Sequence, residues 1–288
     1  MSGQSRRALV FGASGQIGQR VCANLLREGW QIDAVSRSEH ADTPGLRWIR
    51  GDLQHADGLP ARADAIFSCG PLDGFAQWHA AAAQLAPRIV AFGSTSVEVK
   101  RDSVDVAERD IATRLRTAEA LLFATAAAQG AQATVLRPTL IYGAGRDLTL
   151  TRIVALARRT GFFVLPRNAN GGRQPVHVQD LADAALAVVD IPATYAQAYA
   201  LPGGETLSYT QMVQRVLQSL QPPARLLQVP SPIFNGALSA ARALGKMQGM
   251  GEAVVARMQQ DLVFDSEPAR RDFGYAPRDF KPSAEMFG

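Results

Sequence analysis

Cysteine is scarce in this sequence, which holds only Cys22 and Cys69 among its 288 residues. Two cysteines build neither a disulfide framework nor a cysteine-rich metal site, so we expect buried thiols in a reducing compartment and no bound metal. No run of 18 apolar residues is present, so no membrane span is expected. Residues 1–7 lack the apolar stretch of a signal peptide, and we therefore expect a cytoplasmic protein.

Lysine is almost as rare, because only three of the 30 basic residues are lysines. The arginines are scattered along the chain, so the net charge of +4 is not gathered in one basic block. Nucleic acid is therefore not an expected partner. The 47% hydrophobic and 19% charged content is that of a globular protein, long enough for one large or two unequal domains.

Three regularly spaced glycines near the N-terminus follow an apolar run. Residues 8–11 form a short apolar run, and Gly12, Gly15 and Gly18 follow it at the spacing G-x-x-G-x-x-G. Residues 16–27 then carry apolar side chains at helical spacing. Such glycines let the chain turn off a strand, let N–H groups approach a pyrophosphate and let the helix pack close to the sheet. The pattern predicts a dinucleotide-binding turn, with an ordinary strand–turn–helix connection as the alternative.

Apolar runs alternate with helical patterns over the first half of the chain. The expected strands are residues 8–11, 31–35, 46–49, 65–68, 88–92 and 133–136, and the expected helices are 16–27, 78–85 and 106–129. This alternation predicts an α/β fold with a doubly wound parallel (Rossmann-type) sheet, whose ligand lies beyond the carboxyl ends of the strands.

The alternation is less regular after residue 146. Helices are expected at 150–159, 177–189 and 209–220, and a loop at 162–172. We assign residues 1–145 to the dinucleotide-binding core, and residues 146–288 to the remaining core elements and a small substrate-binding portion.

Several segments in order resemble one protein family. They are residues 51–53 (Gly-Asp-Leu), 94–96 (Ser-Thr-Ser), 137–143 (R-P-x-x-x-Y-G), 173–182 (R-x-x-x-H-V-x-D-L-A) and the tail at 264–277. Together with the glycine turn, they resemble the extended or atypical short-chain dehydrogenases/reductases, the NAD-dependent epimerase/dehydratase group. The resemblance covers nearly the whole chain and implies a nicotinamide dinucleotide cofactor, but it names no substrate.

Arg37 decides the expected cofactor. An acid at the end of the second strand would bind the ribose hydroxyls of NAD, whereas an arginine suits the 2′-phosphate of NADP. Asp33, the nearest acid, lies within the strand, so NADP is favoured over NAD; the alternative is that Arg37 is a solvated loop charge. The residues expected to bind the cofactor, several of them by the resemblance alone, are Gly12, Ser14, Gly15, Gln16, Ile17, Gly18, Ser36, Arg37, Ser38, Asp52, Leu53, Cys69, Gly70, Pro71, Ser94 and Pro138.

The family's catalytic Tyr-x-x-x-Lys pair has no counterpart on the helix after the fifth strand. The first tyrosine is Tyr142, and no lysine occurs between positions 100 and 246. Alignment on residues 118–122 puts Ile111 and Leu115 at the two positions, where they either pack in the core or line a cofactor cleft. We therefore take Thr95, Ser96 and Tyr142 as the catalytic candidates, with a turn or packing function as the alternative for each.

Arg173 and His177 are the candidates on the substrate side. By the resemblance, Arg173 occupies the place of an arginine that grips a sugar-nucleotide diphosphate; a structural ion pair is the alternative. His177 titrates in a useful range but stands at an expected helix start, where a structural function is common. The apolar residues Phe162, Phe163, Met247 and Met250 line either a pocket or the core.

The sequence thus predicts an NADP-dependent oxidoreductase or epimerase/dehydratase-like protein. Its partner would be a small substrate, either a carbonyl compound or one resembling a sugar nucleotide, and a homodimer is left open. The alternative is a catalytically inert NADP(H)-binding protein that senses the cofactor or stabilises a complex.

Overall fold

The computed structural model describes residues 5–55, 57–82, 86–243 and 256–287, so Met247 and Met250 lie outside the described residues. The chain forms two compact units. The first comprises Met1–Thr139, Val178–Leu201 and Asp265–Ala276, and the second comprises Leu140–His177, Pro202–Phe264 and Pro277–Gly288. The chain therefore leaves the first unit after Thr139 and returns to it twice.

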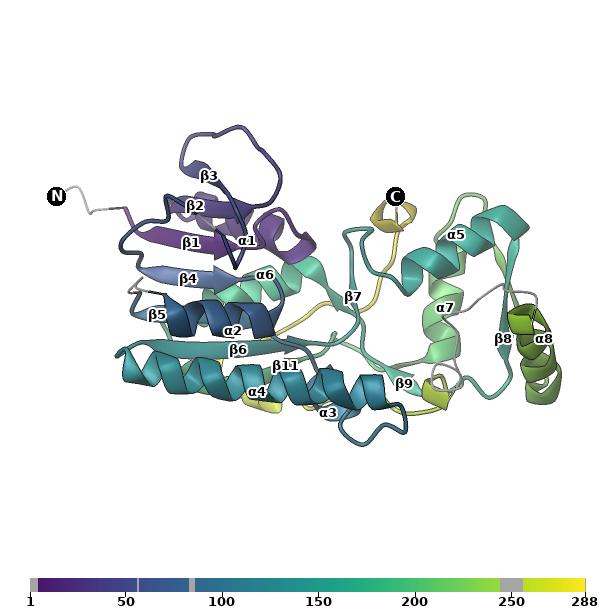
Figure 1. Ribbon diagram of the computed structural model, residues 1–288. Helices are drawn as coiled ribbons and strands as arrows, with labels where there is room; N and C mark the ends of the chain where they lie inside the picture. The colour runs from purple at the N-terminus through teal and green to yellow at the C-terminus, as the bar shows by residue number, and fades with distance from the viewer. Residues whose placement is uncertain (1–4, 56, 83–85, 244–255, 288) are drawn as a thin grey trace. The chain divides into compact units, whose positions relative to one another are not determined.

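A seven-stranded parallel sheet forms the centre of the first unit (Figure 1). Its strand order, β11-β6-β5-β4-β1-β2-β3, confirms the predicted doubly wound fold. The order reverses between β1 and β4, and in such sheets a ligand binds at the carboxyl ends beside this reversal. The strands are β1 (Arg7–Phe11), β2 (Gln31–Ser36), β3 (Leu46–Arg50), β4 (Ala65–Ser68), β5 (Arg88–Phe92), β6 (Gln132–Pro138) and β11 (Gln197–Leu201).

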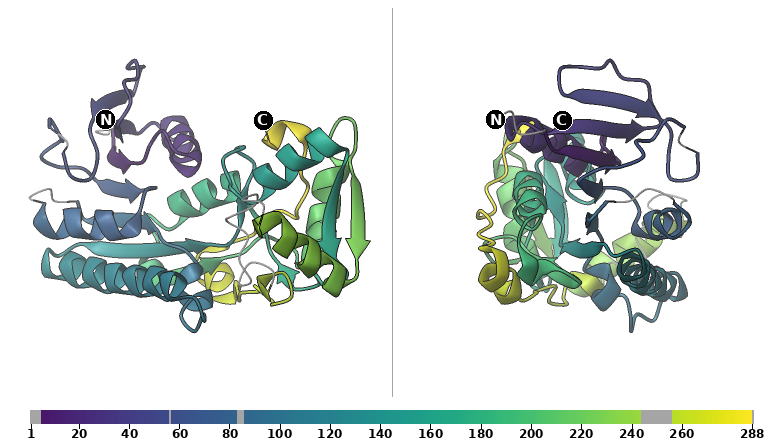
Figure 2. Two further views of the ribbon diagram at one scale, coloured as in Figure 1. Left: turned by 45° about the vertical axis from the view of Figure 1, so that its right-hand side comes forward. Right: turned by 90° about the vertical axis from the view of Figure 1, so that its left-hand side faces the viewer.

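Helices cover both faces of this sheet, which explains why its central strands are largely apolar. Helix α1 (Gln16–Arg27) packs with α6 (Val178–Ala187) on one face, and α2 (Leu72–Ala81) packs with α4 (Val106–Ala128) on the other (Figures 1 and 2). The short elements of this unit are α3 (Ser96–Val99), η1 (Pro192–Thr194) and α10 (Glu267–Phe273).

Helix α2 begins earlier than the predicted residue 78. Its first turns contain Gly74, a poor helix former that obscured the pattern. A Cβ at Gly74 would lie 3.2 Å from Cδ1 of Leu53, so a larger residue would crowd that side chain. The absence of a side chain at Gly74 therefore lets α2 lie close to Leu53, after β3.

The second unit has its own core around β8 (Phe162–Pro166), α5 (Leu150–Thr160) and α7 (Tyr209–Gln218). The predicted loop at 162–172 is wrong for its first part, because β8 pairs in parallel with β13 (Arg225–Val229). The remaining elements of the unit are β7 (Ile141–Tyr142), β9 (Gly172–Arg173), β10 (Val176–His177), β12 (Leu207–Ser208), α8 (Ser231–Ala243) and η2 (Ala284–Phe287).

No helix among the described residues combines the length and the apolar character that crossing a membrane requires.

Candidate functional site

The glycine turn after β1 is too tight for side chains at two of its three glycines. Gly12 has a φ of +68°, and a Cβ there would lie 2.9 Å from the carbonyl carbon of Cys69. A Cβ at Gly18 would lie only 2.2 Å from the carbonyl oxygen of Gly12. Gly15 is less confined, because its Cβ would meet only that same oxygen, at 3.0 Å. The turn therefore brings α1 close to the sheet and leaves room beside Gly15.

Polar atoms around this turn fit a dinucleotide. Helix α1 has Gly15 at its N-cap and no side-chain cap, so its first N–H groups suit an anion. The side-chain oxygens of Gln16 and Ser68 are buried and find no hydrogen-bond partner within the described part of the chain. Because buried polar atoms are normally paired, these two suit a ligand that brings hydrogen-bonding groups of its own. Ile17 is buried and anchors α1 against the sheet.

The segment after β4 borders the turn. The Cys69 N–H donates to the carbonyl oxygen of Phe11 at 2.9 Å, and Gly70 and Pro71 lead into α2. Burial raises the pKa of the Cys69 thiol well above its ordinary range and raises that of Cys22 to about 12. Both thiols are therefore protonated at neutral pH and are poor nucleophiles.

Exposed Arg37 follows the end of β2, and the nearest acid is engaged elsewhere. Asp33 is buried, with its carboxylate 2.6 Å from Nε of Arg47 and 3.6 Å from Nε of Arg7. Arg37 and Ser38 stand on the exposed loop instead. Among the described residues the Arg37 side chain forms no hydrogen bond or ion pair, and its guanidinium is therefore available to a ligand.

Asp52 lies just beyond the end of β3. Its carboxylate accepts hydrogen bonds from the N–H groups of His55, at 2.9 Å, and Gln54, at 2.8 Å. These bonds lower the pKa of Asp52, and the charges of His55 and Arg37 act in the same direction. Leu53 packs against the edge of the core below. Asp52 is thus a fixed anion close enough to Arg37 to interact with it electrostatically.

Three hydroxyl residues follow β5, and their hydroxyl groups differ in their hydrogen-bond partners. Thr95 is buried and its hydroxyl donates to the carbonyl oxygen of Pro138 at 3.1 Å. Ser94 Oγ accepts from the Ser96 N–H, also at 3.1 Å. The Ser96 hydroxyl itself makes no hydrogen bond within the described segments. The hydroxyl of Ser96 is therefore better able than that of Thr95 to donate to a ligand.

An ion-pair cluster holds the ends of β6 and α3. The guanidinium of Arg137 pairs with the buried carboxylate of Glu119 on α4 and, at 3.1 Å, with Glu98 on α3. Desolvation opposes the charge of Arg137, but its bonds to these carboxylates outweigh burial and raise its pKa. These ion pairs thus tie the end of β6 to α3, which follows the hydroxyl residues.

Tyr142 and His177 lie together in the second unit. Their rings meet edge to face with centroids 5.1 Å apart, and the Tyr142 hydroxyl donates to the carbonyl oxygen of Asp279 at 3.2 Å. Gly143 has a φ of +99°, and a Cβ there would lie 2.5 Å from Nε2 of His177. His177 belongs to β10, so the helix predicted from residue 177 begins one residue later. The pair is therefore buried and tightly packed.

Arg173, also in the second unit, is 6% exposed. Its Nη1 donates to the carbonyl oxygens of Gly172, at 2.7 Å, and Gln260, at 2.8 Å, and its Nη2 donates to that of Arg257. The guanidinium also lies 5.1 Å from the centre of the Tyr209 ring. Desolvation lowers the pKa of Arg173 from its ordinary value. This arginine joins β9 to residues 257–260.

Residues 8–98 and 112–200 match the sequence model of the NAD dependent epimerase/dehydratase family. The chain belongs to this family. A curated relative, the 2-alkyl-3-oxoalkanoate reductase of Stenotrophomonas maltophilia, is 27% identical over 94% of this chain and 95% of its own length. The family assignment confirms the resemblance predicted from the motifs.

Solved structures of the epimerase group share the fold. An epimerase from Methanothermobacter thermautotrophicus, Mth375, has a TM-score of 0.72 at 14% identity, covering 99% of this chain and 91% of that one. MoeE5, solved with UDP-glucuronic acid and NAD, has a TM-score of 0.71 at 19% identity and 97% coverage of both chains. At these identities, the likeness concerns the fold alone.

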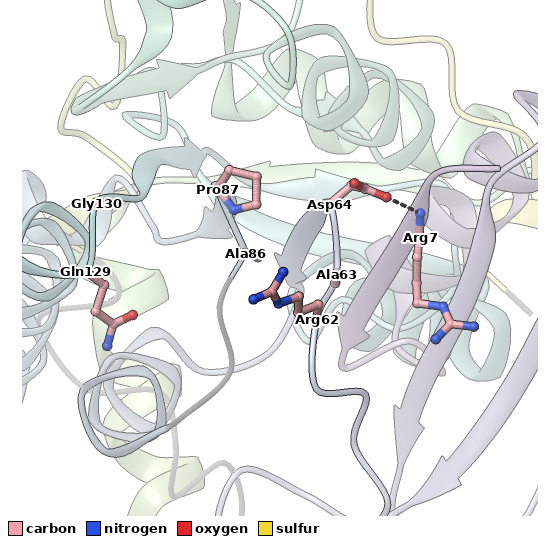
Figure 3. Close-up of a pocket in the computed structure, with 8 residues that line it drawn as sticks. All are labelled: Arg7, Arg62, Ala63, Asp64, Ala86, Pro87, Gln129 and Gly130. Atoms are coloured by element: carbon pink, nitrogen blue, oxygen red, sulfur yellow. Dashed lines mark hydrogen bonds between the residues drawn. The ribbon is translucent and has the colours of Figure 1, made fainter. Parts of the chain in front are cut away.

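A hollow of about 430 Å³ lies at the amino-terminal ends of the strands of the central sheet, opposite the glycine turn. Arg7 begins β1, Asp64 and Pro87 precede β4 and β5, and Gln129 follows α4 (Figure 3). These are amino ends of strands, whereas ligands of doubly wound sheets bind at the carboxyl ends. We therefore do not assign the cofactor to this hollow.

No sequence motif pointed to His40 or Trp48. Nε2 of His40 lies 3.1 Å from Oγ of Ser36, and its ring lies 4.1 Å from that of Trp48. The only available signal was a histidine three residues after Arg37, on a loop already suspected of binding the cofactor.

Proposed function

We propose that this protein is an NADP(H)-dependent oxidoreductase that acts on a small carbonyl substrate. The observation that carries the proposal is the exposed guanidinium of Arg37 after the end of β2, which has no hydrogen-bond or ion-pair partner among the described residues. Ser36 and Ser38 flank it, and the only acid of that strand, Asp33, is buried in ion pairs. When bound, the cofactor supplies or accepts the hydride. The residues around Gly12, Gly15 and Gly18 would hold its pyrophosphate.

Arg173 and a relative support this substrate class. A guanidinium has five N–H groups, and three of those in Arg173 already donate to backbone carbonyl oxygens. With the side chain buried as well, Arg173 is poorly suited to gripping a diphosphate. The Stenotrophomonas relative is named for the reduction of a 3-oxoalkanoate, which is a carbonyl compound. Both points favour a carbonyl substrate over a sugar nucleotide.

The proton donor would come from the hydroxyl residues after β5. Ser96 is our first candidate, since the hydroxyl of Thr95 already donates to Pro138. Thr95 would then fix the backbone around the reacting carbonyl. We do not propose Tyr142 as the donor, because its side chain is buried and its hydroxyl donates to the carbonyl oxygen of Asp279. A positioned acid or base contributes about 10²–10⁴-fold to rate.

The test measures NADPH oxidation against a panel of 3-oxo acids, other ketones and UDP-sugars. We expect turnover with a ketone or 3-oxo acid, a fall of about 100-fold in kcat for Ser96→Ala, and a small effect for Thr95→Ser. Isothermal calorimetry supplies the cofactor arm. Arg37→Ala should weaken NADPH at least about tenfold and leave NADH unchanged, because a charge-assisted hydrogen bond is worth about 1.5–3 kcal/mol. Equal affinity for NADPH and NADH in the parent protein would defeat the NADP assignment.

A catalytically inert NADP(H)-binding protein is the second candidate. It is favoured by the side chains Ile111 and Leu115 at the positions of the family's catalytic pair, and by the gap at residues 99–111 in the family match. Tight NADPH binding with no turnover across the whole panel would select this candidate over the enzyme.

A further inference from the structure

We propose that His40 is a further determinant of cofactor choice, which binds the 2′-phosphate of NADP(H) in its protonated form. This inference rests on the proposed NADP(H) specificity. The imidazole is held on two sides, by Ser36 Oγ at 3.1 Å and by the Trp48 ring, whose plane is tilted 30° from its own. These two contacts orient the exposed imidazole on the loop that also carries Arg37 and Ser38.

The same contacts connect His40 to the glycine turn. Ser36 Oγ also lies 3.0 Å from Oγ of Ser14, which stands between Gly12 and Gly15. The loop that carries Arg37 and His40 is therefore continuous with the turn that would hold the pyrophosphate. A phosphate bound by this loop would sit beside the rest of a dinucleotide rather than at a separate site.

Hydrogen-bond accounting shows what protonation of His40 does. A hydroxyl has one hydrogen to donate and two lone pairs, and one lone pair of Ser36 Oγ accepts from the Ser38 N–H at 3.2 Å. A protonated His40 must donate through Nε2, and it takes the second lone pair. The Ser36 hydrogen then points to Ser14. Protonation thus places a positive charge on the loop and fixes the direction of every hydrogen bond from His40 to Ser14.

The acidic groups around the imidazole of His40 each have a hydrogen-bond or ion-pair partner. On its own loop stand Arg37 and Glu39, and Glu39 is paired with Arg50 of β3 at 2.6 Å. Asp42 is occupied by the N–H of Trp48 at 2.7 Å. Beyond β3 lie Asp52 and His55. His55 has the same ionisable side chain as His40, so it is the competitor that must be controlled.

The test is isothermal calorimetry with NADPH and NADH between pH 6.5 and 8.5. In the parent protein, we expect NADPH affinity to fall about fivefold across this range, the size of one exposed ion pair, while NADH affinity stays constant. The 2′-phosphate itself titrates near pH 6 and gains charge as the pH rises, which acts in the opposite direction. Repeating the titrations in buffers of different ionisation enthalpy should show proton uptake with NADPH only.

His40→Gln is the diagnostic variant, because an amide can still reach Ser36 and Trp48 but carries no charge. It should abolish the fall in NADPH affinity and the proton uptake, whereas the matched variant His55→Gln should retain both. An unchanged pH profile in His40→Gln, or its loss in His55→Gln, would overturn the assignment to His40. If NADPH and NADH bind equally to the parent protein at every pH, the proposed function fails instead, so the two failures are distinguishable.

Discussion

The variant Gly15→Val tests whether the glycine turn after β1 binds the cofactor or serves only for packing. Gly15 has φ and ψ of −75° and 172°, an extended conformation that any residue adopts. Its added Cβ would meet only the carbonyl oxygen of Gly12, at 3.0 Å, so that oxygen must yield by a few tenths of an ångström. Loss of glycine also stabilises by about 0.4–1 kcal/mol through the unfolded chain. We therefore expect unfolding free energies within about 1 kcal/mol of the parent.

Cofactor binding should respond far more strongly. The valine side chain would fill the space beside the α1 N-terminus, where backbone N–H groups would meet the pyrophosphate. Loss of two charge-assisted hydrogen bonds, at about 1.5 kcal/mol each or more, weakens binding at least about 100-fold. Thermal melts and NADPH calorimetry on one preparation measure both quantities.

Gly18→Ala is the control. Its Cβ would lie 2.2 Å from the Gly12 oxygen and 2.7 Å from Cα of Ala13, both backbone atoms, so α1 must move away from the sheet. It should lose about 1–3 kcal/mol of stability, the opposite pattern to Gly15→Val. A folded Gly15→Val variant that binds NADPH as the parent does would refute the cofactor assignment of this turn.

Three further predictions concern the rest of the first unit. The double variant Ile111→Tyr/Leu115→Lys changes two half-buried positions. It should still bind NADPH, and its free energy of unfolding should fall by less than about 2 kcal/mol. A large drop in its melting temperature without cofactor would place both positions in the core. Arg88 is buried and donates to four carbonyl oxygens and two threonine hydroxyls. Arg88→Met should therefore lower the free energy of unfolding, measured in urea, by at least about 3 kcal/mol. A loss under about 1 kcal/mol would contradict this account. Burial raises the pKa of Cys22 to about 12, so its alkylation in the native protein should be slow at pH 8 and should accelerate with pH, whereas rapid labelling at pH 8 would show an accessible thiolate.

Six of the seven strands of the central sheet, β1 to β6, were predictable because each is a short, mostly apolar run followed by a turn or a helix. Strand β11 was missed, since Gln197–Leu201 alternates weakly and pairs with β6, more than fifty residues earlier in the chain. The pair β8 and β13 was missed for the same reason, because Phe162 finds its partner only at Arg225. Pairing of distant segments is decided by packing, and local patterns do not encode it.

In the candidate site, too, local features could be predicted from the sequence and long-range contacts could not. Glycine spacing and Arg37 are local signals, and their positions on the turn and the loop could be predicted from the sequence. The hydrogen bonds of Thr95 to Pro138 and of Arg173 to Gln260 join residues far apart in the chain. Such contacts determine whether a side chain is available to a ligand, and a motif gives only its type.

Three arginines of the predicted motifs show how much this availability matters. Arg173 is buried against backbone carbonyl oxygens, and Arg137 is paired with Glu119 and Glu98. Arg37 differs, because its guanidinium is exposed and has no hydrogen-bond or ion-pair partner among the residues that the structure describes. Forming an ion pair with a new anion costs Arg37 no existing bond, whereas Arg173 and Arg137 must first give up theirs. Of the three, Arg37 is therefore the arginine best placed to select a ligand by its charge.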